Sequence, residues 1–300
     1  MTTQTPTARR VRASAANRLP GDRAIVASPS TWVVWFAVAA FFILLFGILF
    51  SVLTDSFARE WFSGWLPAGY VTDWYSSAWE GFNLGHVIAV TVFVALTTVV
   101  VSVLIGVPAA YQLARRSFPG KKLLMVLFLL PVLMPPLTYG IPLATVMYNL
   151  GFGRTLLGVV LVNLVPAVPF VILTMTPFIE QINPNIESAA RMSGANTLAV
   201  FTRILAPLLI PGLLAASVLV LVRTVGLFEL TFLVSGPESD TLVVTLYRAM
   251  TAAGGTVSRQ LVSSMSVVYA GTMMIILILA LRFVNPTQLV ARVDSDKKAA

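Results

Sequence analysis

The sequence predicts an all-α membrane protein with six transmembrane helices, from its composition and from the length and pattern of its apolar runs. Hydrophobic residues make up 57% of the 300 residues and charged residues 11%, against roughly 45–50% and about 25% in soluble globular domains. A chain with so little charge cannot build a water-facing surface of ordinary composition. The apolar runs lack the alternation of a transmembrane barrel, so we predict helices.

Six segments are long and apolar enough to cross a bilayer, which takes about 20 predominantly apolar residues in a helix. They lie at about 32–53, 87–113, 123–149, 156–178, 204–234 and 261–281. The first is longer than the roughly 7–15-residue apolar core of a secretory signal peptide, and no small-x-small cleavage site follows it, so we interpret it as an uncleaved anchor. The fifth contains Arg223 and Glu229, which leave its outer boundary open.

Positively charged residues fall mostly on one side of these spans. Fifteen of the 20 Lys and Arg residues precede the first span, follow the sixth, or lie between spans two and three or four and five. Since Lys and Arg concentrate in cytoplasmic loops, both termini are predicted to be cytoplasmic. The net charge of +8 is then explained by the orientation of the chain in a lipid bilayer, and it no longer supports nucleic-acid binding.

The predicted organisation is one transmembrane domain at 32–284 between two cytoplasmic tails, 1–31 and 285–300. The first tail is basic and rich in Thr, Ala and Arg, so we expect it to be disordered, with binding to anionic lipid as the alternative. The chain has no cysteine and a single histidine, His86. Thiolate and histidine metal sites are therefore not expected, and no metal ligand is assigned.

Prolines are frequent inside the predicted spans. Pairs such as Pro135–Pro136 and Pro166 with Pro169 interrupt the i→i−4 hydrogen bonds of a helix. In lipid, the freed carbonyls need other partners or a wet cavity. We interpret these spans as broken helices around a pathway that opens and closes, with a rigid kinked bundle as the alternative.

The largest external segment, about Thr54 to His86, is rich in Trp, Tyr and Phe. Such residues favour the level of the lipid headgroups, and they are also frequent anchors in protein interfaces. An interfacial belt and a docking surface for an extracytoplasmic partner are both compatible with this composition.

A short helix is predicted within the loop 179–203 between spans four and five. Asn183 followed by Pro184 is typical of a helix start, and Gly194 is a stop signal. The helix at 184–193 is about 15 Å long at 1.5 Å per residue, too short to span a membrane. Its small residues allow close approach, so it suits another protein's groove, while a plain connecting helix is the alternative.

The same residues resemble a motif. Glu187-Ser-Ala-Ala-Arg-Met-Ser-Gly194-Ala, followed by Ile204-Leu-Ala-Pro207, is similar to the EAA loop of bacterial ATP-binding-cassette (ABC) importer permeases, with Ser188 altering the first triplet. Ala109-Ala-Tyr-Gln-Leu-Ala-Arg, ending at Pro119-Gly120, resembles the turn that follows the family's second span. The chain is thus identified as similar to type I importer permeases with the MetI-like fold, over about residues 84 to 285.

The resemblance implies a transport subunit of the bacterial inner membrane rather than an enzyme. Its implied partners are a second, homologous permease in a heterodimer, two cytoplasmic ATPase subunits and an extracytoplasmic substrate-binding protein. ATP and Mg would be bound by the ATPase, and the 300 residues contain no G-x-x-x-x-G-K-[ST] phosphate loop. The segment 184–197 would dock into the ATPase: Gly194 would allow the turn, the small residues the fit, and Glu187 and Arg191 polar contacts at the groove edge. The expected coupling residues are Glu187, Ser188, Ala189, Ala190, Arg191, Gly194 and Ala195.

The substrate pathway is expected near the outer end of the fifth span. An ionisable residue inside a membrane segment is a functional-site hypothesis, and Glu229 is such a residue, with structural pairing and outward snorkelling as alternatives. Phe228, Tyr139 and Pro135 complete the expected pathway. Arg223 lies six residues before Glu229, too far around a helix for an i,i+4 pair, so it is expected to pair with another span or with the second permease.

The resemblance leaves two substrate branches. The region from Glu229 to Tyr247 looks like that of polyamine-type permeases, which we take as the first expectation. Sugar importers share the Phe118-Pro-Gly turn but usually have Asp where Ser193 stands, and they are the alternative. A secondary transporter is a remote alternative, because only two charges lie in spans and no inverted repeat is found. An intramembrane enzyme lacks a catalytic constellation, and an assembly factor would not need the loop helix.

Overall fold

The computed structural model describes residues 29–62, 64, 66–252 and 257–283. Within this part the regular structure is helical apart from an isolated bridge between Ala58 and Tyr70. The chain divides into two compact units, residues 1–50 and 51–300, each described by itself. The predicted disordered tail lies outside the described residues up to residue 28, as does the predicted C-terminal tail.

The described part of the first unit is a single helix. Helix α1 (Pro29–Phe57) extends the predicted first span by a few residues at each end, and its last residues, 51–57, belong to the second unit. The apolar side chains from Trp32 to Phe50 are largely exposed. A helix that is apolar on all sides suits a lipid or protein environment.

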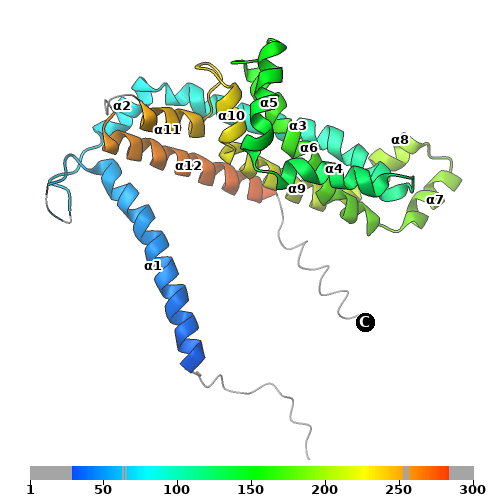
Figure 1. Cartoon of the computed structure of the whole chain (residues 1–300). Coiled ribbons are helices and arrows are strands. Elements are labelled where there is room, and N and C mark those ends of the chain that lie inside the picture. Colours follow the sequence, from blue (N-terminus) through cyan, green and yellow to red (C-terminus); the bar gives the residue numbers. More distant parts are fainter. Residues whose placement is uncertain (1–28, 63, 65, 253–256, 284–300) are drawn as a thin grey trace, which may run out of the picture. The chain divides into compact units, whose positions relative to one another are not determined.

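Four further helices of the second unit are long and apolar enough to cross a membrane: α3 (Leu84–Arg115), α6 (Leu156–Glu180), α9 (Ala206–Gly226, with the turns before it) and α12 (Arg259–Phe283). Helix α3 runs along α6, and α9 packs against both, as the bundle in Figure 1 shows. A Cβ on Gly106 of α3 would lie 2.7 Å from the Val171 side chain of α6. The missing side chain at Gly106 therefore lets the two helices approach closely.

The predicted third span is broken into two helices. Helix α4 (Lys121–Leu133) and helix α5 (Pro136–Asn149) meet at an angle of 96°, and α5 projects from the bundle in Figure 1. Pro135 and Pro136 have no N–H, so the helical hydrogen bonds to residues 131 and 132 cannot form. The described residues thus contain five candidate spans, or six if this bent pair counts as one.

The predicted fifth span, 204–234, is wrong as one continuous helix. Helix α9 ends at Gly226, Leu227 has an extended backbone (φ −78°, ψ 99°), and the short helix α10 (Glu229–Val234) follows. Glycine is a poor helix former, and the buried Leu227 side chain packs in a cluster with Leu230 and Val234 of α10. Two spans of this chain are therefore interrupted, and α5 and α10 lie against each other.

The end of the bundle that carries α2 (Asp73–Gly81) and α11 (Leu242–Thr251) uses some of its aromatic residues internally. Trp61 donates its indole N–H to Asp55, and Trp74 donates to the carbonyl of Ala58. Phe57 packs on Tyr75 with ring centroids 5.1 Å apart. These contacts make part of the aromatic segment structural; Trp65 lies outside the described residues.

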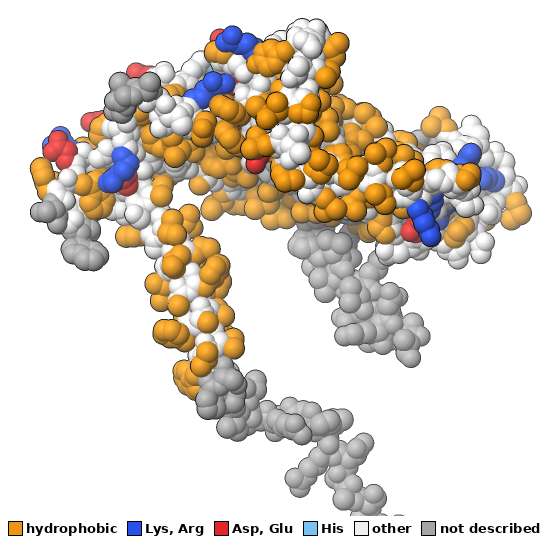
Figure 2. Space-filling view, viewed as in Figure 1, with side chains coloured by type: hydrophobic (Ala, Val, Ile, Leu, Met, Phe, Trp, Pro, Cys, Tyr) orange, Lys and Arg blue, Asp and Glu red, His pale blue; other side chains and the backbone are white. Residues whose placement is uncertain are grey.

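The opposite end of the bundle carries α7 (Pro184–Met192) and α8 (Thr197–Val200), joined to α9 by a π-helical turn (Phe201–Leu205). On the visible face in Figure 2, hydrophobic side chains cover the middle of the bundle and most charged side chains lie toward its two ends. This distribution is typical of a helical bundle whose middle lies in lipid.

Candidate functional site

Helix α7 is built by strong local signals. The side chain of its N-cap residue, Asn183, accepts a hydrogen bond from the N–H of Asn185, and Pro184 occupies the first turn. Past its end, Gly194 has φ +85°, and the N–H of Ala195 bonds back to the carbonyl of Ala190. This is a glycine-ended helix terminus, where a left-handed residue satisfies the last carbonyls. The predicted helix is thus present, one residue shorter than expected.

The Glu187 carboxylate faces the interior of the chain, which corrects the expectation that it contacts a partner at a groove edge. Glu187 is 5% exposed. Tyr111 Oη donates to Glu187 Oε2 at 2.7 Å, and Arg115 Nε donates to Oε1 at 2.7 Å. Arg115 also donates to the carbonyl of Ile182 at 2.9 Å. Because both carboxylate oxygens are bonded within the chain, Glu187 joins α7 firmly to the end of α3.

The remaining coupling residues divide between two faces of α7 and its turn. Ala190 and Ala195 pack against the core of the bundle, while Ser188, Ala189 and Gly194 are exposed. Arg191 is half exposed, with one guanidinium nitrogen 3.7 Å from Glu187 Oε2. Only Ser188, Ala189, Gly194 and part of Arg191 are therefore available to a partner.

Two exposed apolar residues on α7 were not among the predicted coupling residues. Met192 is 85% exposed and Ile186 is 44% exposed, and Leu198 of the neighbouring α8 is exposed as well. Exposed apolar side chains on a short, well-anchored helix are typical of a protein interaction surface. We call Ile186, Met192 and Leu198 the α7 tip.

The expected pathway residues lie at the breaks of the two interrupted spans. Pro135 is exposed and immediately precedes α5. The hydroxyl of Tyr139 donates at 3.4 Å to the carbonyl of Pro131, one of those freed by the proline pair. Phe228 stacks on Phe232 with ring centroids 5.1 Å apart. The two breaks therefore bring polar and aromatic side chains together in the middle of an apolar bundle.

Two charged residues, Arg223 and Glu229, lie in the surroundings of Tyr139. The hydroxyl of Tyr139 lies within electrostatic range of both Arg223 and Glu229. Glu229 is half-buried in the first turn of α10, where the helix dipole favours a negative charge. Within the described residues neither charge forms an ion pair within 4.0 Å, and the guanidinium carbon of Arg223 lies 5.8 Å from the ring centre of Phe170. An intramembrane Arg–Glu pair is thus not formed here.

Asn163 of α6 is a buried polar residue that was not among the predicted site residues. It is 1% exposed, and its amide nitrogen donates to the carbonyl of Val159 at 2.8 Å and to Thr231 Oγ1 at 3.1 Å. Its Oδ1 has no hydrogen-bond partner. Together with Arg223, Asn163 lines a small cavity between α6 and the end of α9.

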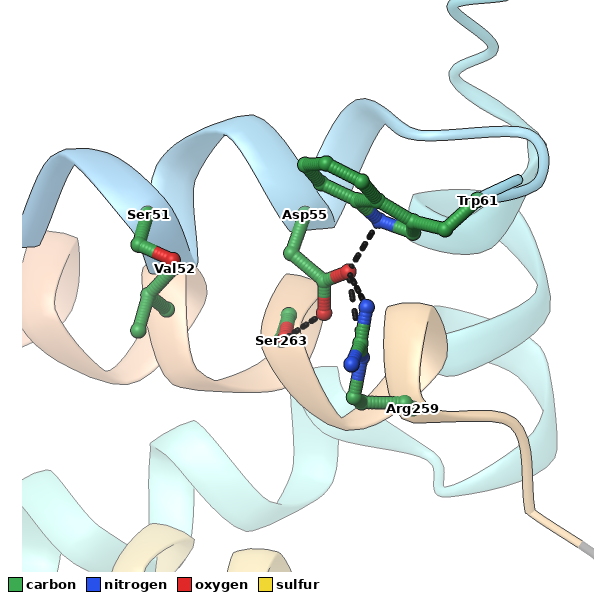
Figure 3. Close-up of a pocket in the computed structure, with 6 residues that line it drawn as sticks. All are labelled: Ser51, Val52, Asp55, Trp61, Arg259 and Ser263. Carbon is green, nitrogen blue, oxygen red and sulfur yellow. Dashed lines mark hydrogen bonds and ion pairs between the residues drawn. The ribbon is translucent and has the colours of Figure 1, made fainter. Parts of the chain in front are cut away.

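A further cluster, centred on Asp55, lies at the α2 end of the bundle, and Figure 3 shows its residues. Asp55 is buried and accepts four hydrogen bonds: one from Trp61, two from Arg259 at 3.2 and 2.9 Å, and one from Ser263 at 2.6 Å. These residues line a cavity of about 440 Å³. Since the carboxylate is saturated, we interpret the cluster as a clamp that fixes residues 51–57 against α12.

No group of three or more His, Cys, Asp or Glu residues is close enough to hold a metal ion in the part of the chain that the structure describes. Tyr111, Arg115 and Asn163 were not predicted as site residues, because their roles depend on contacts across the fold. Tyr111 and Arg115 lie at i and i+4 on α3, and they bond Glu187 more than 70 residues away. That spacing on one helix face was the one available signal.

Comparison with known proteins supplies the family. Residues 102–294 match the family model described as "Binding-protein-dependent transport system inner membrane component". The trehalose transport system permease protein SugB of Mycobacterium tuberculosis is 32% identical over 157 residues, covering 52% of this chain and 57% of that protein. A probable molybdenum ABC transporter permease of Haloferax volcanii is 32% identical over 153 residues, covering 48% and 57%. The chain thus spans little more than half the length of these relatives.

Solved structures show the same fold. One chain of a bacterial alginate ABC transporter, solved in complex with an alginate pentasaccharide-bound periplasmic protein, matches with a TM-score of 0.63 and 15% identity, covering 86% of this chain and 96% of that chain. A chain of the MetNI methionine ABC transporter in an inward-facing conformation matches with a TM-score of 0.53 and 18% identity, covering 67% and 94%. The architecture is therefore the MetI-like fold of type I importer permeases, as the sequence predicted.

Proposed function

The chain belongs to the family of binding-protein-dependent transport system inner membrane components, and on that premise we propose that it forms half of the solute pathway of an ATP-driven carbohydrate importer. A second, homologous permease would form the other half. An extracytoplasmic binding protein would deliver the solute. The chain would lie in the bacterial inner membrane with both termini cytoplasmic, in keeping with the distribution of Lys and Arg.

The observation that carries this proposal is the anchored helix α7. Its tip exposes apolar residues to a partner, while Glu187 holds its inner face to α3 through Tyr111 and Arg115. A displacement of the tip would therefore move the end of α3 with it. We propose that two cytoplasmic ATPase subunits bind ATP and Mg, and that one of them receives the α7 tip in a cleft.

The carbohydrate assignment replaces the polyamine expectation. Relatives named above carry trehalose or molybdenum in their names, and an alginate transporter shares the fold. A diacetylchitobiose uptake permease of Streptomyces coelicolor is also 28% identical over 153 residues. None of these names mentions a polyamine, and the cation Arg223 near the proposed pathway would repel a polyamine.

Substituting Met192 tests the coupling surface. Met192→Asp places a charge on an 85% exposed side chain, so the permease should fold normally and lose most of its bound ATPase because a charge would be buried in the cleft. Co-purification of the ATPase and ATP-dependent uptake in proteoliposomes measure this. The matched control is Ser117→Asp, exposed in the turn between α3 and α4. Equal ATPase recovery and uptake for the two variants would exclude the α7 tip as the coupling contact.

A further inference from the structure

Arg223 is a cation for which the described residues supply no acceptor. It lies half-buried in the last turn of α9. Within the described part of the chain it has no ion pair and no hydrogen bond, and its neighbour is the ring of Phe170, 5.8 Å from ring centre to guanidinium carbon. Intramembrane arginines are costly and almost always face a partner or a water-filled cavity. A group from outside this part of the chain must therefore satisfy its N–H donors.

Asn163 has the opposite need: it has an acceptor atom without a donor. Its Nδ2 hydrogens are both used, by the carbonyl of Val159 and by Thr231 Oγ1. A backbone carbonyl can only accept, so the atom that faces Val159 must be the nitrogen, and the amide orientation is fixed. The atom left without a partner is Oδ1, an acceptor buried at a residue that is 1% exposed. An unpaired buried acceptor costs about 1–3 kcal/mol, so it points to a missing donor.

Arg223 and Asn163 line the same cavity, which we call the Arg223 niche. It is about 10 Å³ in volume, and its lining also includes Pro166, Phe170 and Leu227. That is roughly the space of one water-sized group. The niche therefore has room for a single polar group, and a group that accepts a hydrogen bond from Arg223 and donates one to Asn163 would satisfy both residues.

We propose that the Arg223 niche binds one hydroxyl group of the transported carbohydrate. A hydroxyl both donates and accepts, as the niche requires. A sulfate or molybdate oxyanion has no hydrogen for Asn163, and an ammonium group has no lone pair for Arg223. The inference rests on the proposed function, since it assigns the chemistry of that same pathway. A water molecule satisfies the same two groups, so the experiment separates it from a solute hydroxyl.

The first arm of the experiment identifies the cargo. The melting temperature of the cognate binding protein is measured with trehalose, maltose and chitobiose, and with sulfate, molybdate and spermidine. Stabilisation by at least one carbohydrate is expected. If none of the three carbohydrates stabilises the binding protein, both the carbohydrate assignment and the proposed hydroxyl site are contradicted.

The second arm measures uptake of that carbohydrate and of its monodeoxy analogues by the whole complex in proteoliposomes, at saturating binding protein. Arg223→Gln should lower uptake of the parent sugar roughly ten- to hundredfold, the effect of losing a hydrogen bond to a charged group, and Asn163→Leu roughly two- to tenfold, the effect of losing a bond between neutral groups. One deoxy analogue, which lacks the hydroxyl that bonds both residues, should be carried by the wild type at least as slowly as the parent sugar is by Asn163→Leu, with no further loss in the variant. Thr174→Ala on the same helix is the matched control.

Each other result contradicts a defined part of the proposal. If Asn163→Leu slows all analogues by the same factor as the parent sugar, the niche holds only water. Unchanged uptake in both variants excludes the niche from transport. ATPase co-purification and melting temperature verify assembly, and if Asn163→Leu does not assemble, Arg223→Gln decides by the same comparison. A wild-type complex that does not import a sugar its binding protein binds overturns the proposed function itself, and this inference with it.

Discussion

At the α7 end the buried charge is paired within the chain, whereas in the middle of the bundle polar groups have no partner among the described residues. At the α7 end, Glu187 is bonded by Tyr111 and Arg115 within the chain. In the middle, Arg223 and the Oδ1 of Asn163 have no partner among the described residues. A closed ionic cluster stabilises a fixed geometry, whereas an open one leaves binding capacity for something that comes from outside. The difference indicates that α7 is held rigidly against α3, whereas the Arg223 niche is able to bind a group from outside the chain.

The largest expected effect is at the closed cluster. Glu187→Ala leaves the guanidinium of Arg115 buried and unpaired, and breaking a buried pair in this way costs roughly 3–5 kcal/mol. The free energy of unfolding of the purified permease in mixed micelles measures it. Glu180→Ala, whose carboxylate is 3.6 Å from Lys121 and about half exposed, is the control and should cost under about 1 kcal/mol. Equal losses for the two variants would show that the Glu187 cluster is not what holds α7.

A smaller loss is expected at the clamp of the α2 end. Asp55→Ala removes the acceptor of Trp61 and Ser263, while Arg259, with its side chain 69% exposed, can return to solvent. We expect a loss of about 2 kcal/mol, mainly from the buried donors left unpaired. Asp73→Ala, on an exposed site of α2, is the control. A loss in the free energy of unfolding as large as that of Glu187→Ala would mean that the solvent exposure of Arg259 does not reduce the cost of removing its carboxylate partner.

The smallest effect on stability is expected at the open site. Arg223→Leu removes a cation that has no acceptor in the described residues, so unfolding should change by less than about 1 kcal/mol, or shift toward greater stability. Uptake should nevertheless fall, because the niche loses its donor. Thermal unfolding of the purified permease provides the measurement. A loss of several kcal/mol would show that Arg223 has a structural partner, and the contrast between the two regions would fail.

Much of the fold follows from periodicity and composition alone. Long apolar runs predict the spanning helices, and the cap signals at Asn183 and Gly194 predict the ends of the short polar helix α7. The break predicted at the proline pair 135–136 is present, but the break predicted at Pro166 and Pro169 is wrong, because α6 continues through both prolines. Proline removes a hydrogen bond at each place, and the packing of the helix decides whether it ends there. The break after Gly226 was missed, since glycine in an apolar helix is often tolerated and the packing of Leu227 decides the outcome.

The sequence by itself determined the membrane class, the family resemblance and the position of the short helix, because these depend on local properties of consecutive residues. Only the tertiary structure decided that Glu187 faces inward and that Arg223 and Asn163 share a cavity. The physical reason is that the state of a charge in a membrane protein depends on which groups surround it. Those groups come from α3, α6, α7 and α9, distant segments that only the folded chain brings together.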